Sequence, residues 1–247
     1  MFGIFKKKKE DKKERYFDYS SIVVDMHSHV LPGIDDGAKT PEESIQLIRK
    51  MMDLGIQKII ATPHIMIDYY KNTPQTINGA LEILKAELEK EKIDIVIEAA
   101  AEHYFDETFE ERVKKKELMI MGDNYVLFEF SFISAPPNVI PVVQKLKDLG
   151  YKPILAHPER YTYMEMDQFK TLHDWGLSFQ LNTISLTGYY GRDSKRLAES
   201  LIDQQLIDFI SSDMHHLRHA EALKHALKMP YLEKVMFDYP LKNIMLR

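Results

Sequence analysis

The stretch Ile22-Val23-Val24-Asp25-Met26-His27-Ser28-His29 (IVVDMHSH) places two histidines at the end of a short apolar run. Such a run predicts a buried strand, and side chains at positions i and i+2 of a strand point to the same face. His27 and His29 therefore project side by side from the strand end. Two imidazoles in this position can share one metal ion with a nearby carboxylate. A packed histidine pair explains DMHSH equally well, so the rest of the chain must distinguish the two interpretations.

The composition of the 247-residue chain narrows the classes of protein to consider. With 45% hydrophobic residues, the chain can bury a core large enough for a single α/β barrel domain. The absence of cysteine excludes disulfides, thiolate zinc sites and a cysteine nucleophile. No apolar run approaches the length of a membrane span, and the N-terminus lacks the apolar core of a signal peptide, so a cytoplasmic location is expected.

Charge is unevenly distributed along the chain. The formal net charge is −5, but residues 6–15 (KKKKEDKKER) carry +4, which leaves −9 for the remainder. An acidic body argues against a nucleic-acid-binding surface, and no nucleic-acid partner is expected. We expect residues 1–21 to form a flexible basic leader and residues 22–247 to form the folded domain. The leader sets apolar residues beside four lysines, so weak contact with an anionic membrane surface is an alternative to a purely solvated role.

From Ile22 onward, short apolar runs alternate with longer amphipathic segments. Thr40-Pro41-Glu42-Glu43 predicts a helix start, with Thr40 as the N-cap, Pro41 in the first turn and Glu43 completing a capping box. Regular alternation is typical of a parallel sheet, and seven units without a glycine-rich nucleotide loop favour a closed (β/α)7 barrel over an open sheet. The expected strands are 22–24, 58–62, 93–102, 124–130, 152–157, 177–182 and 207–213, and the expected helices are 41–54, 75–90, 106–116, 136–149, 165–174, 193–205 and 217–228, with a C-terminal cap after residue 229.

Histidines and carboxylates collect at the ends of the expected strands. In a barrel of parallel strands the C-terminal ends meet at one face, where such folds place their functional sites. Glu129 lies within an apolar run, where its charge is costly to bury unless a cation compensates it. Each residue alone has a structural explanation, but six strands that deliver such residues to one face indicate a shared site. The candidates are His27, His29, Asp35, Asp36, His64, Glu102, Glu129, His157, Asp213 and His215.

Five motifs, DMHSH, DDG, TPH, AHPER and SDMH, follow one another in the order of a known family. The chain resembles the polymerase-and-histidinol-phosphatase (PHP) superfamily of metal-dependent phosphoesterases. More narrowly, it is similar to the CpsB/CapC-type bacterial protein-tyrosine phosphatases, which act on tyrosine kinases of capsule and exopolysaccharide synthesis. The resemblance runs from about Ile22 to about Leu217, and it implies a single-domain, distorted TIM-like (β/α)7 barrel of the PHP type.

The resemblance also implies three divalent metal ions, most often manganese. Iron, cobalt and zinc are compatible with the same imidazole and carboxylate ligands. Glu102 is implied to bridge the first and second ions. The implied ligands are His27, His29, Glu102 and Asp213 for the first ion, Glu102, Glu129 and His157 for the second, and Asp36, His64 and His215 for the third.

The implied reaction is hydrolysis of phosphotyrosine on a protein partner, expected to be a bacterial tyrosine kinase, by metal-activated hydroxide. Without cysteine, the phosphocysteine route of ordinary tyrosine phosphatases is excluded. The resemblance places a phosphate-binding arginine at Arg160, for which an ion pair with Glu159 or Asp167 is the structural alternative. Arg218, three residues after His215, departs from the family's spacing but is the candidate for a second phosphate-binding arginine.

Two other functions remain open. One is a PHP-type phosphoesterase acting on a small molecule, such as histidinol phosphate or a nucleotide. The other is a metal-stabilised binding module without catalysis. Asp25 is interpreted as a residue that supports the ligands or the strand end, and His103 as a structural or solvated residue that points away from the site. The tyrosines of Tyr69-Tyr70 and Tyr189-Tyr190 are interpreted as exposed loop residues in preference to a rim that contacts substrate.

Overall fold

The computed structural model describes residues 17–247, so the basic run at 6–15 and its predicted membrane contact lie outside the described residues. Residues 17–21, which the sequence assigned to the leader, pack on the body. The side chain of Tyr19 is buried, and its hydroxyl donates a hydrogen bond to the Leu223 carbonyl (3.0 Å). The folded part therefore begins before Ile22.

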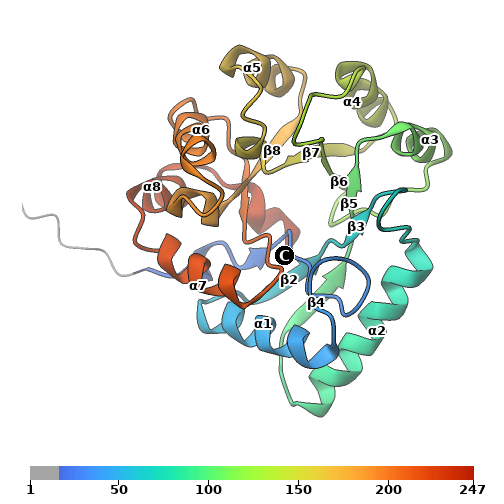
Figure 1. Ribbon diagram of the computed structural model, residues 1–247, viewed down its shortest axis with the longest axis vertical. Helices are drawn as coiled ribbons and strands as arrows, with labels where there is room; N and C mark the ends of the chain where they lie inside the picture. Colours follow the sequence, from blue (N-terminus) through green and yellow to red (C-terminus); the bar gives the residue numbers. More distant parts are fainter. Residues whose placement is uncertain (1–16) are drawn as a thin grey trace, which may run out of the picture.

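In the part of the chain that the structure describes, nine short strands form two parallel sheets. The strand order is β1-β2-β4 in one sheet and β3-β5-β6-β7-β8-β9 in the other. Helices surround the strands in Figure 1, as the predicted alternation requires. The strands are β1 (Val24–Asp25), β2 (Lys58–Ala61), β3 (His64–Ile65), β4 (Val96–Ala99), β5 (Glu102–Tyr104), β6 (Tyr125–Glu129), β7 (Lys152–Ala156), β8 (Ser178–Asn182) and β9 (Phe209–Ser211).

One of the seven predicted strands is interrupted, and one short strand was not predicted. The prediction of one strand over 93–102 is wrong, because the segment is divided into β4 and β5. The predicted strand 58–62 is present as β2, which ends at Ala61. Beyond Thr62 and Pro63 the unpredicted strand β3 follows and pairs with β5. The gap lies at Pro63 because a proline has no N–H to donate to a strand ladder. The Glu102 N–H still donates to the Pro63 carbonyl (3.1 Å) across the break. β2 pairs with β4 and β3 pairs with β5, so the two segments lie side by side on both sides of the break.

Backbone contacts connect the first and last strands. Ser28 and Met214 form an isolated parallel bridge just beyond β1 and β9. The His29 N–H donates to the Met214 carbonyl (2.8 Å), and the Asp213 N–H donates to the His27 carbonyl (2.9 Å). The two ends of the strand series thus meet where the histidines of DMHSH leave β1.

The first helix begins where the sequence predicts. The Thr40 hydroxyl accepts from the Glu43 N–H (3.3 Å), and Pro41 occupies the first turn. The predicted capping box is wrong in its second half, because the Glu43 carboxylate accepts from the Lys39 N–H (2.8 Å) instead. α4 also begins later than expected, at Val139. The helices are α1 (Pro41–Asp53), α2 (Pro74–Lys90), α3 (Glu107–Lys115), α4 (Val139–Asp148), α5 (Met166–Asp174), α6 (Arg192–Asp203), α7 (Leu217–Ala226) and α8 (Pro230–Asp238).

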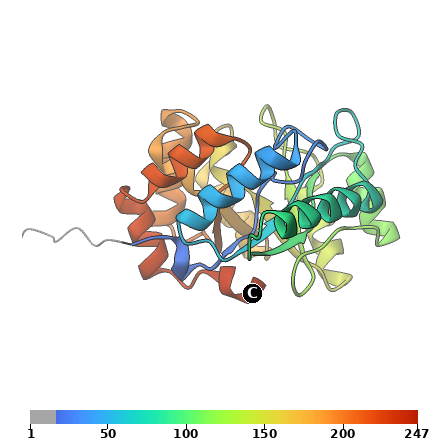
Figure 2. The same cartoon turned by 90° about the horizontal axis from the view of Figure 1, so that it is seen from below.

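The helices form an outer layer that shares the larger hydrophobic core with the strands. α1 lies between α2 and α7, so N-terminal and C-terminal parts of the chain are neighbours (Figures 1 and 2). Within residues 17–247, no helix is long and apolar enough to cross a membrane.

A smaller core takes its residues from the strands and adjoining segments, and none from α1 to α8. On β6, Tyr125 and Leu127 belong to this inner core, whereas Val126 and Phe128 face the larger core. Side chains of a strand alternate between its faces, so Glu129 continues the inner face at the strand's C-terminal end. The alternation places a buried carboxylate directly beyond apolar side chains.

His103 is a structural residue, as predicted. Its side chain is fully buried, its ring packs 5.5 Å from the ring of Phe109, and its Nε2 lies 3.4 Å from the Met119 carbonyl oxygen. Burial, with a smaller contribution from the charge of Arg112, lowers the pKa of His103 to about 3. The folded protein therefore holds this imidazole neutral.

The low pKa of His103 makes folding sensitive to acid. Its folded-state pKa lies below the unfolded value, so its contribution to the free energy of unfolding is complete above about pH 6.5 and is lost as the pH falls toward 3. Between pH 6.5 and 5 the loss is about 2 kcal/mol. We expect His103→Gln to show a smaller loss over this interval, measured by urea unfolding of metal-free protein. An equal decrease in the free energy of unfolding of the wild type and of His103→Gln would contradict the low pKa of His103, whatever the absolute stabilities of the two proteins.

Candidate active site

The predicted metal ligands converge at the C-terminal ends of the strands. Among the described residues, four groups bring together ligand atoms that lie within 4.8 Å of one another. Together these groups contain all nine residues that the resemblance implies. The groups are His29, Asp36, His64 and His215; His27, His29 and Asp213; His27, Glu102 and His157; and His64, Glu102 and Glu129.

The two histidines of DMHSH face each other with their Nε2 atoms 3.2 Å apart. Glu102 Oε2 lies 3.2 and 3.3 Å from these nitrogens, and Asp213 Oδ1 lies 3.3 and 3.4 Å from them. Both oxygens are buried and have no hydrogen-bond partner. Ligands bound to one tetrahedral ion at 2.0–2.1 Å are separated by about 3.3 Å. The four atoms therefore fit a shared cation, which would satisfy the two unpaired oxygens.

Glu102 also reaches a second group. Its Oε1 lies 2.9 Å from His157 Nε2, and its Oε2 lies 3.1 Å from His64 Nδ1, a buried nitrogen without a hydrogen bond. Glu129 faces the same two histidines, with Oε1 3.1 Å from His64 Nδ1 and Oε2 3.7 Å from His157 Nε2. Glu102 thus lies between the two groups, where a bridging carboxylate would have to be.

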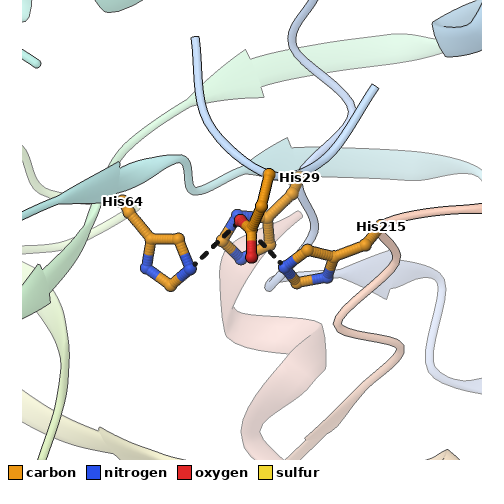
Figure 3. Close-up of side chains that lie close together, drawn as sticks. His29, His64 and His215 are labelled. Carbon is orange, nitrogen blue, oxygen red and sulfur yellow. Dashed lines mark ion pairs between the residues drawn. The ribbon is translucent and has the colours of Figure 1, made fainter. Parts of the chain in front are cut away.

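The third group is centred on Asp36, whose Oδ1 lies 3.5 Å from His64 Nε2 and 3.4 Å from His215 Nε2. Figure 3 shows His64 and His215 on either side of His29, with dashed lines for these ion pairs. The rings of His29 and His215 are stacked with centroids 3.9 Å apart. The resemblance implies His64 for the third ion alone, whereas its two ring nitrogens face both the second and the third group.

Two side chains that are not implied metal ligands contact the Nδ1 atoms of His27 and His29. His27 Nδ1 lies 2.8 Å from Gln180 Oε1, and His29 Nδ1 lies 2.7 Å from Asp35 Oδ2. Amide and carboxylate oxygens accept hydrogen bonds, so each Nδ1 keeps a proton and each Nε2 is the ring atom available to bind a cation. Asp35, a neighbour of the implied ligand Asp36, therefore orients His29.

Sequence reasoning missed the contribution of β8. Gln180 Nε2 donates to Asn182 Oδ1 (2.9 Å), and Asn182 Nδ2 donates to Asp213 Oδ2 (2.7 Å). These two amides, both fully buried, connect His27 to Asp213 by an unbroken chain of hydrogen bonds. The available signal was a polar pair at i and i+2 in the apolar run LSFQLN, which places both amides on one face.

The β8 amides lead to a prediction for metal affinity. We expect Gln180→Leu to weaken metal binding by about 10- to 100-fold, because loss of the acceptor for His27 Nδ1–H releases the ring and its tautomer. Gln180→Glu, which keeps an acceptor, should retain more of the affinity. Calorimetric titration with Mn²⁺ measures the effect, and urea unfolding of the metal-free proteins monitors the fold. Wild-type affinity in Gln180→Leu would contradict this role.

Local backbone geometry also brings the site together. A Cβ atom at Gly37 of the DDG motif would lie 1.9 Å from the His29 carbonyl oxygen, so only glycine permits this approach. His157 and Asp213 adopt left-handed φ angles of 34° and 51° at the ends of β7 and β9. This conformation costs a non-glycine residue about 1 kcal/mol or more, and such strain is typical of functional sites.

The buried charges of the site stabilise one another. Burial alone would raise the pKa of Glu102 and of Asp213, but the neighbouring histidines, His27 foremost, hold both pKa values well below the usual range. Burial alone would lower the pKa of His64, but the charge of Glu102 raises it to about 9. The carboxylates therefore remain ionised, and cations that bind here displace protons from the imidazoles.

Asp25 supports the strand end, as predicted. Its carboxylate accepts from Ser211 Oγ (2.8 Å) and from the Ser212 N–H (2.9 Å). Ser211 Oγ in turn accepts from the His27 N–H (2.8 Å). Asp25 thus fixes the end of β1 against β9 and does not join the metal-ligand groups.

Arg160 lies at the edge of the site. Its guanidinium packs 4.0 Å from the ring centre of Phe132 and 4.3 Å from that of Tyr190. Arg160 Nη1 lies 3.9 Å from Asp213 Oδ2. The alternative of an ion pair with Glu159 is wrong, because Glu159 is buried and accepts hydrogen bonds from the end of β8 and the turn that follows it.

Arg218 occupies a different environment. It is exposed in the first turn of α7 and forms no hydrogen bond or ion pair within the described part of the chain. Two of the loop tyrosines, by contrast, contact the site. The ring of Tyr70 stacks on His64 (5.4 Å), and Tyr190 covers Arg160, so their interpretation as exposed loop residues is wrong. Tyr69, which is 73% exposed, fits that interpretation.

Comparison with known proteins agrees with this geometry. Residues 23–245 match the family model described as capsular polysaccharide synthesis, CpsB/CapC. The chain is 33% identical over 199 residues to the tyrosine-protein phosphatase YwqE of Bacillus subtilis (strain 168), a match that covers 79% of this chain and 78% of that relative.

Solved structures give the same result for the fold. One structure, from work on YwqE of Bacillus subtilis and CpsB of Streptococcus pneumoniae described as unique metal-dependent tyrosine phosphatases, matches with a TM-score of 0.81 at 30% identity, over 90% of this chain and 93% of that chain. A histidinol phosphate phosphatase of Lactococcus lactis matches in fold alone, with a TM-score of 0.53 at 12% identity, over 83% and 92% of the two chains. The predicted barrel class is thereby confirmed, and the chain belongs to the CpsB/CapC family of capsular polysaccharide synthesis.

Proposed function

We propose that this chain is a metal-dependent protein-tyrosine phosphatase that hydrolyses phosphotyrosine on a protein. The observation that carries the proposal is the convergence of two unpaired, buried carboxylate oxygens, from Glu102 and Asp213, with five histidines beside Arg160. The names of the relatives support phosphotyrosine as the substrate.

The site is proposed to hold three divalent ions, of which manganese is favoured, with iron, cobalt and zinc as alternatives. The grouping of ligand atoms around Glu102 and around Asp36 supports more than one ion. Divalent ions bound there supply Lewis-acid polarisation of the phosphoryl group and lower the pKa of a bound water. The proposed ligands are His27, His29, Asp36, His64, Glu102, Glu129, His157, Asp213 and His215.

The chain's own residues have separate tasks in this proposal. Arg160 offers the phosphoryl oxygens a fork of N–H donors that Phe132 and Tyr190 hold in place. Glu102 and Asp213 stay ionised and balance the charge of the ions. Tyr70 covers His64 and restricts solvent at that edge. The leaving phenolate has a pKa near 10 in water and needs little help from a general acid.

The protein substrate is proposed to be a bacterial tyrosine kinase that controls capsule or exopolysaccharide synthesis, in the cytoplasm. Family membership supports this partner. Residues 22–247, with residues 17–21 packed on them, are proposed to be the phosphatase domain. Weak membrane contact by the basic leader stays a prediction.

The test combines metal analysis with turnover of three substrates: a phosphotyrosine peptide, histidinol phosphate and a nucleoside monophosphate. We expect manganese-dependent release of phosphate from the peptide, loss of activity with a chelator, and at least two metal ions per chain at saturating manganese. Preference for histidinol phosphate or the nucleotide would replace the proposed substrate. Absence of metal-dependent phosphate release from all three would favour a binding module instead.

A further inference from the structure

A cavity of about 410 Å³ opens beside the candidate active site. Arg160, Phe132, Thr162 and Tyr190 form one part of its wall, and residues 191–194 at the start of α6 form the other. Arg160 belongs to both places, since it lines the cavity and its Nη1 lies 3.9 Å from Asp213 Oδ2. The cavity therefore adjoins the place proposed for the phosphoryl group.

Unpaired polar groups from α6 line the cavity. Arg192 is exposed and forms no hydrogen bond or ion pair within residues 17–247, whereas Asp193 forms an ion pair with Arg196. Ser194 is 6% exposed, and among the described residues its hydroxyl has no hydrogen-bond partner. The chain outside the basic run carries −9, so a cavity lined by two arginines and one carboxylate, which is paired with Arg196, is a local exception that favours an anion.

The cavity lies within reach of the residues that flank a bound phosphotyrosine. Successive residues of an extended peptide are separated by about 3.3 Å. If Arg160 holds the phosphoryl group, a side chain that flanks the phosphotyrosine reaches toward Arg192 past Tyr190, because the Arg160 guanidinium itself fills the space between Phe132 and Tyr190. The two rings provide apolar surface for the backbone and stem of that flanking residue.

We propose that this cavity binds an anionic side chain, a carboxylate or a second phosphotyrosine, next to the substrate phosphotyrosine. This inference rests on the proposed function and adds a sequence preference to it. Arg192 provides the positive charge and the Ser194 hydroxyl provides a hydrogen-bond donor. Arg160 lies between the cavity and the site of reaction.

The experiment compares kcat/KM for four phosphotyrosine peptides that differ in the flanking positions: alanine, aspartate, lysine and a second phosphotyrosine. The measured quantity is the ratio of each value to that of the alanine peptide. We expect a ratio of about five for one or both anionic peptides, below one for the lysine peptide, and a decrease of the anionic ratio with salt. The two anionic peptides distinguish a carboxylate site from a phosphoryl site.

A substitution of Arg192 tests whether this residue causes the preference for anionic flanking residues. In Arg192→Gln the anionic ratio should fall toward one. The matched control is Lys195→Gln, which removes one positive charge from the same helix outside the cavity lining and should keep the ratio. Equal turnover of all four peptides by the wild type, or an unchanged ratio in Arg192→Gln, would overturn the inference alone. Turnover of none of the peptides would overturn the proposed function and this inference with it.

Discussion

Glu102→Gln is expected to reduce phosphotyrosine hydrolysis by about a thousand-fold, the effect of losing about 4 kcal/mol of transition-state stabilisation. The substitution keeps the shape of the side chain but removes the charge that faces His27, His29 and His64 at 3.1–3.3 Å. An amide cannot bridge two cations as a carboxylate does. Loss of Glu102 should therefore remove metal from two of the groups at once, and the measured metal content should fall together with kcat.

The control for Glu102→Gln is Glu98→Gln. Glu98 belongs to β4, is 48% exposed in its side chain and pairs with Lys58 (2.7 Å) away from the predicted ligands. Metal content and turnover of this variant should match those of the wild type. Full metal content with wild-type turnover in Glu102→Gln would show that the carboxylate of Glu102 has no part in the reaction.

Arg160→Lys is expected to lower kcat/KM for a phosphotyrosine peptide by about a hundred-fold, with no change in metal content. A lysine keeps the positive charge, but it loses the planar fork that lies between Phe132 and Tyr190. Phosphoryl oxygens would then be held by a mobile point charge. Because Arg160 is not a predicted metal ligand, kcat/KM should fall while the affinity for Mn²⁺ stays that of the wild type.

Arg49→Lys is the matched control for Arg160→Lys, since Arg49 is exposed and pairs with Glu91 (2.8 Å). Its kinetic constants should equal those of the wild type. A wild-type kcat/KM in Arg160→Lys would exclude bidentate recognition by Arg160. Parallel loss of metal and activity would instead assign this arginine a role in keeping the metal-ligand groups together.

Local sequence pattern was sufficient for much of the fold and for the identity of the candidate ligands. The period of two in a strand put His27 beside His29, and the apolar run around Glu129 marked this carboxylate as one that needs a cation. Thr40 and Pro41 marked the start of α1 because capping depends on neighbours within one turn. Parallel strands then required the residues that follow each strand to meet at one end.

Contacts between distant segments were decided only by the tertiary structure. The alternation of side chains along one strand does not determine which side chains of different strands touch. These contacts depend on strand register, on twist and on breaks such as the one at Pro63. For this reason the supporting roles of Gln180 and Asn182 were not predicted, and the two-sided position of His64 differed from its implied assignment. The difference between Arg160, which lies at the edge of the site, and Arg218, which is exposed on α7, was also decided by the tertiary structure.

DMHSH by itself determined that two imidazoles leave β1 on the same side. Packing determined what each of them faces. Asp35 and Gln180, from different parts of the chain, hold the Nδ1 atoms, and Glu102 and Asp213 meet the Nε2 atoms. The physical reason is that strand geometry sets the direction of a side chain over a few residues, whereas distances of about 3 Å between buried charged atoms arise only when the whole ring of strands is assembled.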